Sequence, residues 1–133
     1  MNKTKFSTII IAGLISGLSL TAYAGDKPES FKKGKKIYSA NCVACHQATG
    51  QGIPSAFPPL AGSDYLADRT QTINVPLKGL SGKITVNGQD YNSAMPAFAH
   101  LSDEDIAAVL TYVTNDWGNE AAEFTAEEIK ALR

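Results

Sequence analysis

The sequence contains few of the residues that form metal and redox centres. Among its 133 residues are two cysteines, Cys42 and Cys45, and two histidines, His46 and His100. A structural zinc site needs four ligands, usually from two Cys or His pairs, so these residues would leave it incomplete. A thioredoxin-like pair follows a β-strand, whereas the residues before Cys42 have helical spacing and no β-branched run. A metal-only site and a thiol-redox site therefore remain as alternatives, but the sequence lacks the further ligands that the first needs and the preceding strand that the second needs.

The sequence also lacks an apolar run long enough to span a membrane. Small and polar residues interrupt the apolar segment 6–20, and a bilayer needs roughly 20 apolar residues. Basic residues precede this segment and Ala22-x-Ala24 follows it, so the three parts of a secretory signal peptide are present. We expect cleavage after Ala24, which would leave one periplasmic domain of 109 residues with no membrane anchor.

An excess of positive charge is absent as well. Cleavage would remove Lys3 and Lys5 but no acidic residue, which leaves ten basic residues against 13 acidic ones and a net charge of −3. Nucleic-acid-binding proteins are usually strongly basic, so we expect no nucleic-acid partner.

The motif that carries chemistry is Cys42-Val43-Ala44-Cys45-His46. The pattern Cys-x-x-Cys-His is the signature of covalent c-type haem attachment. Two thiols add across the two vinyl groups of the porphyrin, and one helical turn spans the distance between the resulting thioethers. His46 is then held under the iron as its proximal ligand. We therefore predict one haem c, bound through Cys42 and Cys45.

Met95 is the predicted second axial ligand of the iron. It is the only methionine that remains after cleavage, and Pro96 restricts it to extended backbone, which stiffens the loop that presents the sulfur. Phe98 can screen the iron from water. A lone methionine often only fills a core, and His100 is a competing ligand. However, His100 directly precedes a helix start capped by Ser102, which favours a surface or hinge position.

Periodicity and capping patterns predict an all-α fold of four to five short helices with a small β-hairpin. Apolar spacing of i, i+3, i+4 and i+7 indicates the helices, and Asn87-Gly88 is a two-residue hairpin turn. Ser30, Ser102 and Thr125 are predicted N-caps. Pro76 should kink or shorten its helix. The expected helices cover residues 29–41, 63–78 (two short helices broken near 68–70), 103–115 and a segment from 125, and the hairpin strands cover 84–86 and 89–91.

The sequence resembles the class I cytochromes c over nearly all of residues 26–118. Its segments 56–66 and 84–98 are most similar to periplasmic single-haem cytochromes of bacterial respiratory chains and to haem domains fused to some copper nitrite reductases. The matching features are Gly34-x-x-x-Tyr38, Cys42-x-x-Cys45-His46, Gly50, Gly52, Phe57-Pro58-Pro59-Leu60, Asn87-Gly88, Met95-Pro96 and Tyr112.

This resemblance implies a cytochrome c domain at 25–118, followed by a C-terminal extension at 119–133. Gly34 would let Tyr112 approach where the first helix crosses the helix at 103–115. The carbonyl of Pro58 would accept the Nδ1 hydrogen of His46, which fixes the ring. Leu60 and Tyr91 are weaker pocket candidates. Hydrogen-bond donors to the haem propionates or to the methionine sulfur are expected among Tyr91, Asn92, Gln89 and Trp117. Two departures from the family are Pro76 and the lack of an obvious arginine or tryptophan partner for the haem propionates.

A closed iron site predicts an electron carrier and not an enzyme. If His46 and Met95 fill both axial positions, no substrate can bind the iron, and one-electron transfer remains. The expected partners are redox proteins such as a terminal oxidase, a nitrite reductase or a dehydrogenase. The carrier itself is expected to be a monomer. The alternatives are a haem c subunit fixed in a dehydrogenase or reductase complex, and a sensor or catalyst whose sixth ligand detaches.

A basic cluster is formed by Lys32, Lys33, Lys35 and Lys36. Charge runs are usually solvated helix faces, and this is the interpretation we favour. The functional alternative is a docking patch that steers a redox partner.

Overall fold

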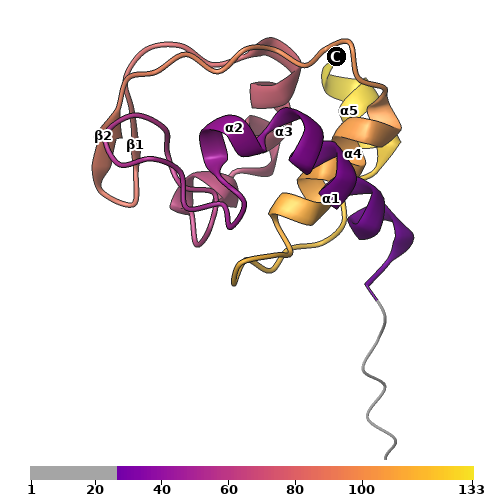
Figure 1. Ribbon diagram of the computed structural model, residues 1–133. Coiled ribbons are helices and arrows are strands. Elements are labelled where there is room, and N and C mark those ends of the chain that lie inside the picture. The colour runs from indigo at the N-terminus through magenta and orange to yellow at the C-terminus, as the bar shows by residue number, and fades with distance from the viewer. Residues whose placement is uncertain (1–26) are drawn as a thin grey trace, which may run out of the picture.

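The computed structural model describes residues 27–133 (Figure 1). The proposed signal peptide, residues 1–24, lies outside the described residues. Within residues 27–133, none of the helices has the length and the apolar character that crossing a membrane requires.

Residues 27–133 form five α-helices, one 3-10 helix and one short hairpin, which agrees with the predicted all-α fold, although the short helix at Val43–His46 was not predicted. The hairpin strands pair antiparallel, with Thr85 opposite Asp90. In chain order the elements are α1 (Glu29–Asn41), α2 (Val43–His46), the 3-10 helix η1 (Asp64–Ala67), α3 (Arg69–Lys78), β1 (Ile84–Val86), β2 (Gln89–Tyr91), α4 (Asp103–Val113) and α5 (Ala126–Leu132).

Helix α1 has the predicted bounds but a different start signal. Pro28 is the N-cap, and its carbonyl accepts the Lys32 amide at 3.2 Å. The prediction that Ser30 caps the helix is wrong, because Ser30 lies inside the first turn and its hydroxyl donates to Glu123 at 2.8 Å. Proline is compatible with this position, because its φ of −56° lies in its fixed range and the cap uses its carbonyl and not an amide.

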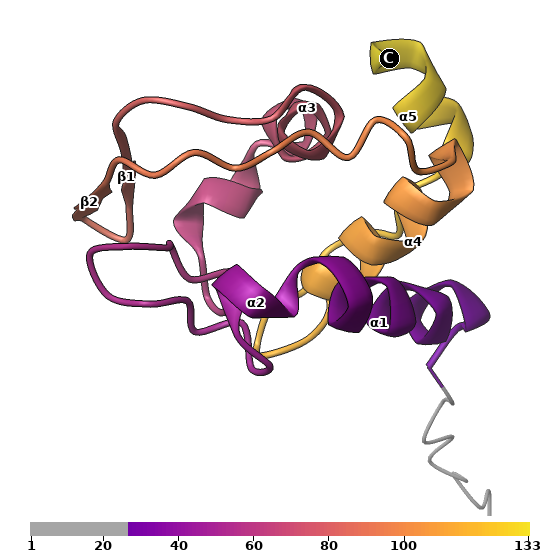
Figure 2. The ribbon, with the colours of Figure 1, turned by 45° about the horizontal axis from the view of Figure 1, so that its top comes forward.

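Helices α1 and α4 cross in direct contact (Figure 2). A Cβ atom at Gly34 would lie 2.0 Å from the Ala108 carbonyl oxygen and 2.8 Å from the Tyr112 Cβ. Only a residue without a side chain allows this approach. Phe31 and Tyr38 flank the contact, and both rings pack against Tyr112 with centroids 5.0 and 5.4 Å away. The predicted contact between Gly34 and Tyr112 is therefore present.

The stretch 63–78 is divided as predicted, but Pro76 does not end its helix. Asp68 separates η1 from α3 and caps α3 by accepting the Gln71 amide at 2.9 Å. The helix continues past Pro76 to Lys78 and ends at Gly79. The missing amide of Pro76 therefore affects only the last turn, where the cost of proline is limited.

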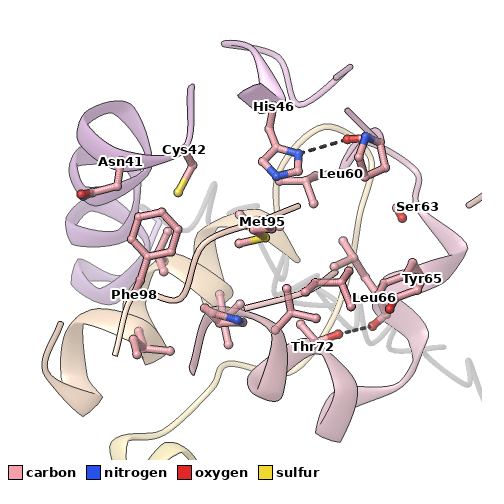
Figure 3. A pocket seen from close by; sticks show the side chains of 18 of the residues that line it. Asn41, Cys42, His46, Leu60, Ser63, Tyr65, Leu66, Thr72, Met95 and Phe98 are labelled. Atoms are coloured by element: carbon pink, nitrogen blue, oxygen red, sulfur yellow. Dashed lines mark hydrogen bonds between the residues drawn. The ribbon is translucent and has the colours of Figure 1, made fainter. Parts of the chain in front are cut away.

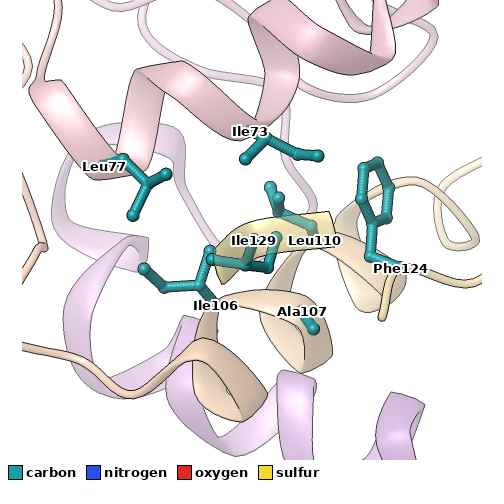
Figure 4. Packing of buried hydrophobic residues seen from close by; sticks show 7 residues of the cluster. All are labelled: Ile73, Leu77, Ile106, Ala107, Leu110, Phe124 and Ile129. Atoms are coloured by element: carbon teal, nitrogen blue, oxygen red, sulfur yellow. The ribbon is translucent and has the colours of Figure 1, made fainter. Parts of the chain in front are cut away.

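The core has two clusters of buried residues. One lies where α1 crosses α4, and the other joins α3, α4 and the extension 119–133 (Figure 4). Phe124 and Ile129 come from the extension and are buried against Ile73 and Leu77 of α3 and Ile106 of α4. Ser102 caps α4 and Thr125 forms a capping box on α5, as predicted. Helix α4 ends at Val113, two residues before the predicted 115. The extension thus belongs to the same packed unit as the helices before it.

Candidate haem-binding site

An apolar cleft lies between α1, α2, α3, α4 and the loop that carries Met95 (Figure 3). The larger of its two parts holds about 880 Å³ of space between protein atoms, some of it open to solvent. Cys42, His46 and Met95 border both parts, so the two form one cleft. Among residues 27–133, no Asp, Glu, Lys or Arg side chain lines the cleft. Such a site suits a large, mainly apolar group.

His46 ends α2 and is oriented by a backbone carbonyl. Its Nδ1 lies 3.0 Å from the oxygen of Pro58. A carbonyl can only accept, so Nδ1 carries the hydrogen. The other ring nitrogen faces the cavity on the side of Met95 (Figure 3). Burial lowers the pKa of His46, while the bond to Pro58 partly opposes that shift. The ring is therefore neutral near pH 7 and keeps a lone pair for a metal ion.

The Pro58 carbonyl reaches His46 because the loop after α2 folds back on itself. The Gly52 amide donates to the His46 carbonyl at 3.0 Å, and the Ile53 amide donates to Phe57 at 2.8 Å. Gly52 has a φ of +65°, and a Cβ there would lie 2.3 Å from the Phe57 oxygen. Both facts require glycine at this position.

The two cysteines lie beside His46 at the wall of the cleft. Cys42 stands between α1 and α2, and its carbonyl accepts the amides of Cys45 and His46 at 3.2 and 3.0 Å. Burial, and secondly the neighbouring Cys45, raise the pKa of the Cys42 thiol to about 11. Reactive redox cysteines have a lowered pKa, so this environment argues against a thiol oxidoreductase. The described residues also contain no group of three or more His, Cys, Asp or Glu suited to a metal ion.

Met95 is held at the opposite side of the cleft by the chain that follows α3. It exchanges two backbone hydrogen bonds with Leu80, at 3.0 and 2.8 Å. The Phe98 amide donates to the Pro76 carbonyl at 2.7 Å, which ties the same loop to α3. In Figure 3 the sulfur of Met95 lies in the cleft below the His46 ring.

His100, the competing ligand, points elsewhere. Its side chain is exposed, its ring centroid is 6.0 Å from that of Phe98, and it borders neither part of the cleft. The structure therefore brings Met95, and not His100, opposite His46.

Other predicted pocket residues divide into two groups. Pro58 and Leu60 line the larger part of the cleft, and Tyr91 lines the smaller part. Gln89, Asn92 and Trp117 line neither. Trp117 packs instead on Tyr38 and Tyr112, with ring centroids 5.0 and 5.2 Å away.

Sequence reasoning missed several lining residues. Ile37 and Asn41 are one helical turn apart on α1 and lead into Cys42, so their spacing could have identified them. Others come from separate elements and share no local pattern. They are Ser63, Tyr65, Leu66, Thr72, Val75, Leu80, Ile84, Val86 and Leu101.

The lysine cluster of α1 lies away from the cleft. All four of its side chains are exposed, and none borders either part. Lys33 forms an ion pair with Asp105 of α4 at 2.7 Å.

The residues present fit a covalent haem. The cleft provides an apolar lining without charged groups, a buried neutral imidazole and a thioether on the opposite side. The two thiols stand beside that imidazole, as the attachment chemistry of a c-type haem requires. Imidazole and thioether are also the usual axial pair of cytochromes c.

Comparison with known proteins agrees with this geometry. A cytochrome c-552 of Thermus thermophilus is 51% identical over 110 residues, which span 75% of this chain and 83% of that protein. Cytochrome c6 of Gloeothece citriformis is 34% identical over 114 residues, or 84% and 92% of the two chains. The cytochrome c subunit of a quinone alcohol dehydrogenase of Gluconobacter oxydans is 34% identical over 103 residues, 75% of this chain but 22% of that subunit. The Cytochrome c family profile matches residues 31–117. The chain therefore belongs to the cytochrome c family, as a class I c-type cytochrome.

Proposed function

We propose that the chain carries single electrons by means of one haem c, attached through Cys42 and Cys45 and ligated by His46 and Met95. The observation that carries this proposal is that His46 and Met95 face each other across one apolar cleft, with both cysteines beside the histidine. Bound there, haem would supply one-electron redox chemistry at its iron.

The chain contributes a rigid and dry setting for that chemistry. Pro58 fixes the ring of His46, and the paired backbone of Leu80 fixes Met95, so neither ligand needs to move when the charge changes. The apolar lining excludes water, and together with a methionine ligand it favours the reduced form of the iron. If His46 and Met95 both hold the iron, no position on the metal would remain for a substrate. This supports an electron carrier over an enzyme.

A second candidate role is that of a subunit in a larger redox enzyme. Dehydrogenase cytochrome subunits are among the similar proteins, and this chain spans 22% and 25% of two of them. The chain instead spans most of the length of cytochromes c-552 and c6, which favours a free carrier. Purification separates the two roles, because a carrier is recovered alone and a subunit is recovered with its complex.

The proposed location is the periplasm, reached through the signal peptide at residues 1–24. Redox proteins are the proposed partners, among them a terminal oxidase, a nitrite reductase or a dehydrogenase. The salt dependence of the electron-transfer rate tests whether the α1 lysines take part in docking. A rate that falls with rising salt supports the patch, and a flat profile removes it.

A visible spectrum of the oxidised and reduced protein tests the haem and its ligands together. We expect a c-type haem that stays attached after acid–acetone extraction, and no binding of carbon monoxide or azide to the native iron. In Met95→His the methionine signature should be replaced by that of two histidines. In Met95→Ala the iron should become open to carbon monoxide.

His100→Ala is the matched control, since His100 is exposed and outside the cleft. Its spectrum should equal that of the wild type. A changed spectrum in His100→Ala, with an unchanged one in Met95→Ala, would reverse the ligand assignment. Pigment lost on extraction would instead contradict covalent attachment.

A further inference from the structure

The segment after Met95 is held by an arginine from the C-terminal extension. Arg133 donates from Nε to Asp103 Oδ1 at 2.8 Å, from Nη1 to the Ala99 carbonyl at 2.7 Å and from Nη2 to the Leu101 carbonyl at 2.9 Å. All three acceptors lie in residues 99–103, which connect the Met95 loop to α4. A planar guanidinium can serve three acceptors at once, which a lysine cannot do in the same geometry.

Arg133 has a fixed base because the rest of the extension is anchored to α3. Arg69 pairs with both carboxylate oxygens of Glu128, at 2.7 and 2.8 Å, and its guanidinium carbon lies 3.7 Å from the centre of the Phe124 ring. Phe124 and Ile129 are buried, at 6% and 0% exposure. The extension therefore cannot easily follow a moving loop, so Arg133 restrains residues 99–103 relative to the core.

The Met95 loop is thus restrained at two places. On its α3 side, Leu80 and Pro76 bind the backbone of Met95 and Phe98. On its α4 side the restraint comes from Arg133. Loss of the second restraint would leave the carbonyls of Ala99 and Leu101 to water and give residues 96–101 more freedom. The thioether would then spend more time away from the cleft.

We propose that Arg133 is a positioning residue for the Met95 thioether. By restraining the Met95 loop, Arg133 sets how readily another ligand displaces that sulfur from the iron. This inference rests on the proposed function, because it presupposes haem bound with Met95 as a ligand. Arg133 does not line the cleft and acts only through residues 99–103.

The test compares imidazole binding to oxidised wild-type holoprotein and to Arg133→Gln. Binding is followed by loss of the sulfur-to-iron charge-transfer absorption. Since apparent affinity scales with the fraction of protein in the open state, we expect imidazole to bind about tenfold more tightly to the variant. Arg133→Lys should bind imidazole with an affinity between those of the wild type and Arg133→Gln. Amide hydrogen exchange should also become faster at Phe98 and Leu101, and stay unchanged within α1.

Two control variants separate positioning from general stability. Phe31→Leu removes a ring contact with Tyr112 in a core cluster that contains no residue of the extension, and it leaves the Arg69–Glu128 anchor and the Arg133 acceptors in place. It should therefore lower the melting temperature without changing imidazole affinity. Lys130→Gln alters an exposed charge of α5 and should change neither the melting temperature nor the imidazole affinity.

Equal imidazole affinity in wild type and Arg133→Gln would overturn the inference, even if the variant melts earlier. Equal affinity changes in Arg133→Gln and Phe31→Leu would also overturn it, since both would then act through stability. If the wild-type spectrum shows no methionine ligation, the proposed axial pair itself fails, and the role of Arg133 fails with it.

Discussion

Backbone groups, and not other side chains, orient the two residues that face each other across the cleft. Pro58 presents a carbonyl to His46, and Leu80 pairs with the amide and the carbonyl of Met95. Contacts of this kind do not depend on the identity of the contributing side chain, but they do depend on the path of the chain. Single residues that set that path are therefore the sensitive positions, and Gly34 and Gly52 are two of them.

Gly34→Ala should destabilise the protein through one misplaced methyl group. The new Cβ would lie 2.0 Å from the Ala108 carbonyl oxygen, so α1 and α4 would have to separate. Overpacking of this kind costs about 1–3 kcal/mol of unfolding free energy. Denaturant unfolding of the holoprotein measures the loss. Ser39→Ala, at an exposed position of the same helix, is the control, and an equal stability of both variants would contradict the close helix crossing.

At the scale of elements, α5 completes a core that α3 and α4 leave open. Phe124 and Ile129 are buried in that core, and the Arg69–Glu128 pair lies at its edge. Arg69, by its hydrogen bonds to the carboxylate, is the main cause that lowers the pKa of Glu128 to about 2, from an ordinary value of 4.5. A lowered carboxylate pKa means that the ionised form stabilises the folded state.

Glu128→Gln should therefore have a pH-dependent effect. Above about pH 4.5 the wild type should be more stable by roughly 0.5–1 kcal/mol, a modest value because the pair is partly exposed. The difference should shrink as the pH falls from 4.5 toward 2, where the wild-type carboxylate becomes protonated. Melting temperatures of both proteins across this range provide the measurement. A difference that grows on acidification would show that the pair does not stabilise the fold.

At the scale of the whole molecule, the cleft leaves the protein without a complete core of its own. Residues of α1, α3 and α4 pack against one another on one side, but side chains such as Ile37, Val75 and Val109 also border the cleft, whose larger part holds about 880 Å³ including some open solvent. A domain of this size has limited apolar burial, and a large apolar group bound there contributes much of what is missing.

Cys42→Ala combined with Cys45→Ala should accordingly give a poorly folded, easily degraded chain. The measurements are circular dichroism and thermal melting, with Ala44→Ser as the control at an exposed position between the two cysteines. A double variant with wild-type-like spectra and melting would show that the fold is stable without its cofactor.

Local patterns explain which parts of the fold were predictable. Helix α1 and both hairpin strands have the predicted bounds, because apolar periodicity and the Asn87-Gly88 turn depend on neighbours in the sequence. The caps Ser102 and Thr125 follow the same logic. For the site, the Cys-x-x-Cys-His motif, and the resemblance that assigned Pro58, located one side of the cleft in advance.

Long-range pairs explain what was not predictable. The two hydrogen bonds of Leu80 with Met95 and the contacts of Arg69 and Arg133 join positions far apart in the sequence. Residues 119–133 read as a linker and a tail with one capped helix, since burial of Phe124 and Ile129 depends on partners from other helices. The error at Ser30 was of a different kind: serine and proline are both acceptable helix starts, and the pattern did not decide between them.

The pairing of Leu80 with Met95 closes residues 81–94 into a loop whose two ends meet. Gly82 lies exposed in it, and nothing approaches within 4 Å of a Cβ placed there. Inserted residues at this point would lengthen a loop that is already closed, at a small entropic cost. A peptide inserted at Gly82 should therefore be tolerated while the Met95 thioether keeps its position.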